Sequence, residues 1–512
     1  MTNNCKSAPT EQGSQRQSIT RSWTSMDRNV VKRHVYKAQC KIFQAIRNKE
    51  FNLMNRLKKR LFKSLDARFL AVLRVTSNQG KHTPGVDGKV YMTPEDKWDL
   101  VESLRNTKDY HASPARTVYI PKKDGTKRKL NIPTMKDRAM QALLYITMVP
   151  EWEAKFEPHS FGFRPGRNPI DAITYISRNF IPKKGNKTHP GWVLDADISA
   201  CFDNINHDAL LDKLRHEPHV KLIKQWLKSG AISNIGFTAT SKGTPQGGVI
   251  SPLLANIALD GMERTFGIYN RNGNYSKPSQ RTGLNRNIAL YRYADDFIVI
   301  GQSREILEDY VVPKLRDFLS TVGLSFNSAK TRIVNISEGF DFLGFHFHRF
   351  HRKDGSTKEF IYSPCRNRLD YFLHKLKVWL RKSQHLSVQD IIIGLNRKIR
   401  GFCEYFKWSH AHKAFAYLNH RLFKMLWNWV QHRHQRKRGA RWLKYRYWRP
   451  KANGSQWVFS FKGIDLIQPY DLTTRWWLRP PVRIHSSIFD SSDNEYWEKR
   501  MKNATWMSPK AV

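Results

Sequence analysis

Two apolar segments of the chain contain closely spaced carboxylates. One reads Trp192-Val-Leu-Asp-Ala-Asp197, and the other reads Tyr291-Arg-Tyr-Ala-Asp-Asp-Phe-Ile-Val-Ile300. Burying unpaired carboxylates among Val, Leu and Ile is costly, so a cation generally holds such groups. If the segments are neighbouring strands, Asp197 and Asp295 form an oxygen-lined site that suits Mg²⁺, and strand alternation adds Asp195 on the face of Asp197. Two such ions can activate a 3′-hydroxyl and stabilise a leaving pyrophosphate.

The segments that must position these carboxylates predict a mixed α/β body. Two short β-type runs flank Lys122-Lys-Asp-Gly125, a hairpin signal with Asp-Gly at its turn. From there to about Phe350, helix-like and strand-like segments alternate, and the strands are expected to stop after Ser363. A set of helices is then predicted from Leu369 to about Gln435, because apolar residues recur there at helical spacing.

The amino-terminal part is predicted to be helical as well. Between about Asp27 and Ser77, apolar residues recur at three- and four-residue steps, which indicates two amphipathic helices. We interpret their basic faces as RNA-contacting rather than merely solvated. These faces carry Lys32, Arg33, Lys41, Arg56, Lys58, Lys59 and Arg60.

The net charge of the chain indicates a polyanionic partner. Its 512 residues include 88 Lys+Arg against 43 Asp+Glu, a formal net charge of +45. A polyanion must offset such self-repulsion, and nucleic acid is the usual one, with a generic basic protein of ribosomal type as the alternative. The five cysteines form no Cys-x-x-Cys pair, and no apolar run has the length of a membrane span. We therefore expect reduced thiols and no membrane partner.

Ordered sequence blocks around the carboxylates resemble those of reverse transcriptases. Tyr293-Ala-Asp-Asp296 is similar to their YxDD box, whose second residue is commonly Ala in the group II intron class. The other blocks resemble the fingers hairpin, the SxGFRPGR block typical of group II enzymes, the first catalytic block, the PQGxxxSP block, the lysine block and the primer grip. They are Tyr119–Thr134, Ser160–Arg167, Asp197–Asp203, Thr244–Asn256, Ser328–Thr331 and Phe342–Phe345.

This resemblance implies roles for individual residues. Catalysis would depend on Asp197, Asp295, Asp296 and Lys330, and Lys330 would assist pyrophosphate departure as a general acid. Two Mg²⁺ ions would be held by Asp197, Ile198, Asp295 and Asp296. The incoming deoxynucleoside triphosphate would be bound by Lys122, Arg128, Phe202 and Gln246, with Phe202 rejecting a 2′-hydroxyl.

The stretch from Tyr405 to Gly463 contains fourteen Lys/Arg, fifteen aromatic residues and no Asp or Glu. A solvated face of ion pairs needs both signs of charge, so phosphate binding with base stacking fits better. Phe423, Trp427 and Trp429 have the spacing of core residues. The expected RNA contacts are Arg433, His434, Arg436, Lys437, Arg438, Arg441, Lys444 and Arg446. Leu395–Phe402, shortly before this stretch, and Trp427–Trp429 within it also resemble the maturase (X) domain of the same family.

The resemblance implies an α/β (α+β) right-hand polymerase followed by an all-α thumb. The expected parts are a flexible tail (1–26), an N-terminal extension with fingers (27–170) and a palm with the carboxylates (171–350). A helical thumb or maturase domain X (351–450) and a small DNA-binding region (451–512) follow. The last sixty residues contain no Cys, unlike relatives that end with an HNH endonuclease, so we expect a bacterial, endonuclease-lacking type whose DNA primer comes from elsewhere.

The function that follows is an RNA-directed DNA polymerase that binds its intron RNA. It would assist splicing as a maturase and copy the intron at a DNA target during retrohoming, inside a ribonucleoprotein. Bacterial cytoplasm is the expected compartment, with mitochondrion or plastid as alternatives, and the sequence does not indicate an oligomeric state. The alternatives are a maturase whose polymerase centre is idle and a domesticated reverse transcriptase in defence or repair.

Overall fold

The computed structural model describes residues 22–121, 125–181, 191–233, 236–268, 288–352, 357–451, 457–472, 474 and 480–502. Its amino-terminal part contains three helices where the periodicity predicted two: α1 (Arg28–Arg47), α2 (Phe51–Lys63) and α3 (Leu65–Thr76). Ser64 separates α2 from α3 because its extended backbone ends one helix while its hydroxyl accepts a hydrogen bond from Ala67 N–H and caps the next. The prediction of a flexible tail up to residue 26 is wrong at its end. Trp23 is buried, and the centroid of its ring lies 4.5 Å from that of Phe69.

Lys58 does not lie on the RNA-contacting face to which the sequence assigned it. Lys58 is fully buried, and its ammonium donates to the carboxylates of Glu151 and Glu217. Burial lowers the pKa of Lys58, yet the two carboxylates outweigh that effect, so its pKa is raised above the ordinary value. Lys58 therefore joins α2 to the segments that carry Glu151 and Glu217 and is not available to RNA.

Two sheets form the fingers and the palm. The fingers sheet has the strand order β2-β1-β4-β5, and the palm sheet has the order β6-β7-β3-β8 with every neighbouring pair antiparallel. The fingers strands are β1 (Ala115–Pro121), β2 (Lys127–Ile132), β4 (Ala231–Ser233) and β5 (Gly236–Thr238). The palm strands are β3 (Trp192–Asp197), β6 (Ala289–Tyr293), β7 (Asp296–Gly301) and β8 (Arg332–Asn335).

The palm strands are apolar on both faces because both faces are covered. On β7, Phe297 and Val299 pack into the core shared with the fingers helices, while Ile298 and Ile300 pack into the core shared with the thumb. The helices and helical turns of this body are α4 (Pro94–Ser103), α5 (Met135–Lys155), α6 (Pro169–Phe180), α7 (Cys201–Asn204), α8 (His207–Lys213), α9 (Val220–Lys228), α10 (Ser251–Leu259), η5 (Ile306–Val311) and α11 (Val312–Thr321).

The thumb begins with strands, so the all-α description of 351–450 is wrong at its start. Strand β11 (Thr357–Pro364) pairs with β10 (Phe345–His351), which pairs with β9 (Phe340–Phe342). The alternating aromatic residues of this hairpin stack on one another, which favours strand over helix. The helices that follow are α12 (Arg366–Lys382), α13 (Val388–Phe406), α14 (His412–Arg433) and α15 (Ala440–Tyr447), and a small sheet of β12 (Trp448–Pro450), β13 (Trp457–Phe461) and β14 (Ile464–Asp465) closes the region.

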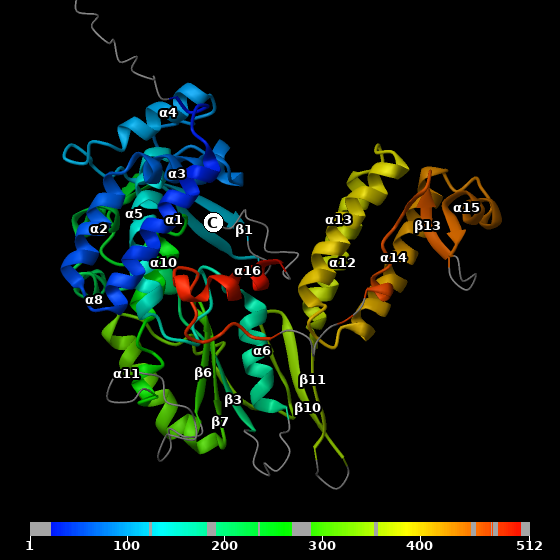
Figure 1. Ribbon diagram of the computed structural model, residues 1–512. Helices are drawn as coiled ribbons and strands as arrows, with labels where there is room; N and C mark the ends of the chain where they lie inside the picture. Colours follow the sequence, from blue (N-terminus) through cyan, green and yellow to red (C-terminus); the bar gives the residue numbers. More distant parts are fainter. Residues whose placement is uncertain are drawn as a thin grey trace, which may run out of the picture.

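The segment 480–502 returns from the thumb to the body. Its helix α16 (Asn494–Lys502) lies beside α6 and the amino-terminal helices (Figure 1). The Arg500 guanidinium forms a buried ion pair with Asp171, the first-turn carboxylate of α6. Gly166 lies so close to the Trp497 ring that a Cβ there would meet it at 2.8 Å. Within the region expected to bind DNA, the segment 480–502 thus packs against the protein body.

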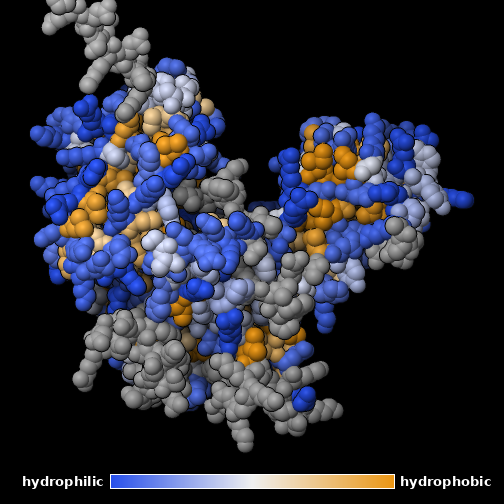
Figure 2. All heavy atoms as spheres, in the orientation of Figure 1, coloured by the Kyte–Doolittle hydropathy of each residue, from blue (hydrophilic) through white to orange (hydrophobic). Residues whose placement is uncertain are grey.

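The thumb helices stand apart from the fingers as a separate lobe (Figure 1). In the space-filling view a hollow lies between the two lobes. Hydrophilic residues dominate the surface of both, interrupted by an apolar strip along the thumb and by apolar patches on the larger lobe (Figure 2). Among the described helices, none combines the length and the apolar composition needed to cross a membrane.

Candidate active site

The carboxylates of the two apolar segments lie on neighbouring strands. In the register of β3 and β7, Asp197 is directly opposite Asp296. Tyr293 pairs with Asp296 across β6 and β7, so Ala294 and Asp295 are the two residues of a tight hairpin turn, in which Ala294 has a positive φ of 60°. The sequence predicted Asp197 and Asp295 on adjacent strands; in the structure Asp296 is the strand neighbour of Asp197, and Asp295 lies in the turn directly before it.

The segment before β8 contacts the same carboxylate. Lys330 Nζ donates to Asp197 Oδ2 at 2.7 Å, and the Asn327 backbone N–H donates to the Asp197 carbonyl at 2.8 Å. Asn327 Nδ2 is also within 3.4 Å of Asp197 Oδ2. Lys330 therefore lies beside the carboxylate that the sequence placed at the centre of the site, and Asn327 is a neighbour that sequence reasoning missed.

The electrostatics of the site are those of crowded negative charge. Desolvation, followed by the charges of Asp295, Asp197 and Asp195, raises the pKa of Asp296 to about 6. Desolvation and the charge of Asp197 also raise the pKa of Asp295 above its ordinary range. A divalent cation relieves such repulsion, so the donor set is suited to one.

The protein alone supplies only part of a metal coordination shell. Among the described residues, no three His, Cys, Asp or Glu side chains converge closely enough to hold an ion by themselves. Mg²⁺ in polymerase-type sites is bound by one or two carboxylates together with substrate phosphates, and that requirement is met by Asp197 opposite Asp296. Ile198, also expected as a ligand, has a buried apolar side chain and can offer only its backbone carbonyl.

Residues expected to bind the nucleotide meet beside the carboxylates. Arg128 Nε on β2 donates to Gln246 Oε1 at 3.0 Å, and Gln246 Nε2 donates to Asp203 Oδ2 at 3.2 Å. The Phe202 carbonyl accepts from Thr244 N–H, in the loop that carries Gln246. Three of the four expected residues are thus brought together from the fingers hairpin, the first block and the Gln246 loop. Lys122 lies outside the described residues.

The basic residues expected to contact RNA divide into two groups. Arg433 and His434 serve the thumb fold, since Arg433 Nη1 donates to the Leu386 carbonyl at 2.9 Å and His434 Nε2 is 2.8 Å from the Tyr447 hydroxyl. The other six side chains are exposed along α15 and the connection before it: Arg436, Lys437, Arg438, Arg441, Lys444 and Arg446.

The aromatic residues predicted to be core also divide. Trp429 is buried in the thumb, as its spacing predicted, and Trp427 is half-buried. Phe423 is 47% exposed, so its placement in the core was wrong. Its ring and that of Trp427 both lie against Trp448, which forms an aromatic cluster at the thumb surface. The helical period could not distinguish this cluster from a core stripe.

Comparison with known proteins covers most of the chain. Residues 23–104 match the family described as N-terminal domain of reverse transcriptase, and residues 120–347 match reverse transcriptase (RNA-dependent DNA polymerase). Residues 369–448 match the group II intron, maturase-specific domain.

Individual proteins agree with these matches. Protein YkfC of Escherichia coli is 33% identical in an alignment 308 residues long that covers 55% of this chain and 79% of YkfC. Group II intron-encoded protein LtrA of Lactococcus lactis is 26% identical in an alignment 420 residues long that covers 67% of this chain and 68% of LtrA. Among solved structures, apo telomerase from Candida tropicalis aligns with a TM-score of only 0.34 at 17% identity, covering 48% of this chain and 55% of that one.

The three matched families follow one another along the chain without overlap, and the palm sheet within the reverse transcriptase match carries the paired carboxylates. The chain therefore belongs to the group II intron-encoded reverse transcriptases with a maturase domain, and it is an RNA-directed DNA polymerase.

Proposed function

We propose that Asp197, Asp295 and Asp296 hold two Mg²⁺ ions, with the Ile198 carbonyl as a further ligand. The observation that supports this most is the register of the palm sheet, which sets Asp197 opposite Asp296 beside the turn that carries Asp295. When bound, such ions activate a 3′-hydroxyl and stabilise the charge of the leaving oxygen.

The residues around these carboxylates supply substrate binding and a proton. Arg128 provides a guanidinium for the triphosphate, and Lys122 is proposed as its partner. Gln246, joined to Arg128 and Asp203, lines the position of the incoming base and sugar, with Phe202 beneath the 2′-carbon. Lys330, whose Nζ donates to Asp197, is proposed to transfer a proton to the departing pyrophosphate oxygen.

The template and partner that we propose are the intron RNA and a DNA target with its primer. The exposed basic and aromatic side chains of α15 and the preceding connection offer phosphate contacts and stacking surfaces to unpaired RNA. The chain would then assist splicing and copy the intron into DNA at the target site.

Primer extension on poly(rA)·oligo(dT) with Mg²⁺ tests the polymerase centre. Wild-type protein should incorporate dTTP, and Asp295→Asn should lose synthesis by at least about 100-fold while binding RNA as before, because only metal ligation is altered. Asp208→Asn, at an exposed carboxylate of α8, is the matched control and should keep full activity. Absence of incorporation by folded wild-type protein would favour a maturase with an idle polymerase centre.

Salt-dependent binding of intron RNA tests the thumb surface. Replacing Arg436, Lys437 and Arg441 with Ala should weaken binding and reduce the slope of log K against log salt by about 2 to 3. The control replaces three exposed lysines of α9, namely Lys221, Lys224 and Lys228. An equal effect of both triple variants would show that the affinity reflects net charge and not this surface.

A further inference from the structure

The turn that carries Asp295 has a strained backbone conformation, and neighbouring residues pack against it. Ala294 adopts the left-handed region, which is unfavourable for a residue with a Cβ. Gly162, in the loop before α6, lies against this turn so closely that a Cβ there would approach Ala294 N to 2.3 Å. Strain of this kind persists only where surrounding contacts enforce it.

A buried arginine supplies such a contact. Arg292 lies on β6, two residues before the turn, and its side chain is fully buried. Its Nη1 donates to the Ala294 carbonyl at 3.2 Å and to Asn256 Oδ1 at 2.9 Å. Asn256 Nδ2 in turn donates to the Gly162 carbonyl at 2.8 Å. Hydrogen bonds thus connect the Ala294 carbonyl through Arg292 and Asn256 to Gly162, which itself packs against the turn.

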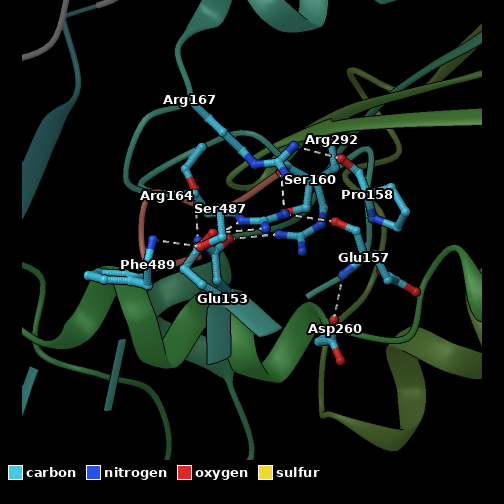
Figure 3. A network of polar contacts seen from close by, with 12 residues as sticks. Glu153, Glu157, Pro158, Ser160, Arg164, Arg167, Asp260, Arg292, Ser487 and Phe489 are labelled. Atoms are coloured by element: carbon cyan, nitrogen blue, oxygen red, sulfur yellow. Dashed lines mark hydrogen bonds and ion pairs between the residues drawn. The ribbon is translucent and has the colours of Figure 1, made fainter. Parts of the chain in front are cut away.

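Burying the charged side chain of Arg292 is unfavourable, so packing alone does not explain an arginine at this position. Its Nε and Nη2 have no hydrogen-bond partner in the structure, and desolvation lowers its pKa. The carboxylates of Glu157 and Asp260 partly compensate its charge. Figure 3 shows Arg292 beside Ser160 and Glu157, in a polar network that continues to Arg164 and Glu153. An apolar side chain would fill this position without the electrostatic cost.

We propose that Arg292 is a positioning residue for Asp295. By bonding the carbonyl of Ala294, it fixes the peptide that joins Ala294 to Asp295 and therefore the direction in which the Asp295 carboxylate leaves the turn. This inference rests on the proposed metal-binding role of Asp295. It assigns to Arg292 no contact with substrate or metal.

The test compares Arg292→Met with Arg349→Met, which removes a buried arginine of β10 whose Nη2 donates to the Phe180 carbonyl. Both variants are measured by circular dichroism, by steady-state primer extension and by Mn²⁺ binding in electron paramagnetic resonance without substrate. In folded Arg292→Met, kcat should fall about 10- to 100-fold with little change in the KM for dTTP, and Mn²⁺ binding should weaken several-fold. Arg349→Met should retain the wild-type kcat and Mn²⁺ affinity.

A folded Arg292→Met with wild-type kcat and Mn²⁺ affinity would overturn the proposal, as would equal losses in Arg349→Met. If Arg292→Met does not fold, Arg292→Lys carries the test, because it keeps the charge but loses the forked donor geometry. It should show a smaller loss in the same two measurements, and wild-type values would again overturn the proposal. Inactive wild-type protein would instead contradict the proposed function, so the two failures are distinguishable.

Discussion

Asp197 lies directly opposite Asp296 across strands β3 and β7, and Lys330 Nζ is 2.7 Å from the Asp197 carboxylate. Arg332 Nε is 3.3 Å from the Asp195 carboxylate, so two basic side chains contact this group of carboxylates. The balance of charge in the site should therefore depend on pH and on divalent ions.

Asp296→Asn should stabilise the metal-free protein at neutral pH. The pKa of Asp296 is raised to about 6, so the folded state holds a proton that the unfolded state releases, and stability falls as pH rises from about 4 through about 6. In EDTA, the Tm of Asp296→Asn should exceed the wild-type Tm by a few degrees at about pH 7.5, and the difference should shrink toward pH 5. Mg²⁺ should raise the wild-type Tm more than that of the variant. A constant difference across this pH range would contradict the prediction.

Lys330→Ala and Lys330→Arg should both be slow polymerases. Arginine can keep the ion pair with Asp197, but its guanidinium does not release a proton at any accessible pH. Loss of a general acid typically costs about 10²- to 10⁴-fold in rate, so both variants should fall by at least about 100-fold in kcat. Single-turnover extension is the measurement. Near wild-type turnover by Lys330→Arg would mean that Lys330 serves only as the ionic partner of Asp197.

Lys58→Met should destabilise the protein without changing its affinity for RNA. It leaves Glu151 and Glu217 buried without their shared cation, a loss that typically costs about 3–5 kcal/mol. Denaturant unfolding followed by fluorescence measures the stability, and filter binding measures the RNA affinity. Lys59→Met, at the exposed neighbour, is the control and should leave stability unchanged. Weaker RNA binding by folded Lys58→Met would restore the original assignment of this residue.

Arg500→Met should loosen the segment 480–502 from the body. The ion pair of Arg500 with Asp171 is buried, so the variant should lose about 3 kcal/mol or more. Asp171→Asn added to Arg500→Met should cost less than the sum of the single changes, by about 1–3 kcal/mol. Limited proteolysis should cut 480–502 first in Arg500→Met and not in Lys502→Met, the exposed control. Additive losses would show that the two side chains are not coupled.

The carboxylates that we propose as catalytic could be located from the sequence because part of their signal is local. Each follows or interrupts an apolar strand-like segment, and the ordered blocks around Asp197 and Asp295, which resemble those of reverse transcriptases, favoured a metal site over an exposed Asp-Asp turn. Arg292 carried a comparable signal, a lone cation inside an apolar strand, that we did not interpret. Its hydrogen-bond acceptor, Asn256 Oδ1, lies 36 residues away in the chain and could not be predicted from the local pattern.

Other features depended on partners that no local pattern reveals. Lys58 has the helical spacing of an exposed residue, but its carboxylates lie 93 and 159 residues further along the chain. Arg433 and His434 belong to the same basic run as Lys437, yet tertiary contacts with Leu386 and Tyr447 engage them. Charge and period identified the basic surface but not which of its members the fold itself uses.

The docking of the segment 480–502 has a consequence for synthesis on the ribosome. The Tyr36 hydroxyl bonds to the Ile488 carbonyl, 452 residues away, and Phe489 completes a small cluster with Phe43 and Val149. At about 5–20 residues per second, helix α1 emerges roughly 20 to 90 s before these contacts can form. The nascent chain must therefore keep part of its earliest helix uncovered until translation has passed the thumb.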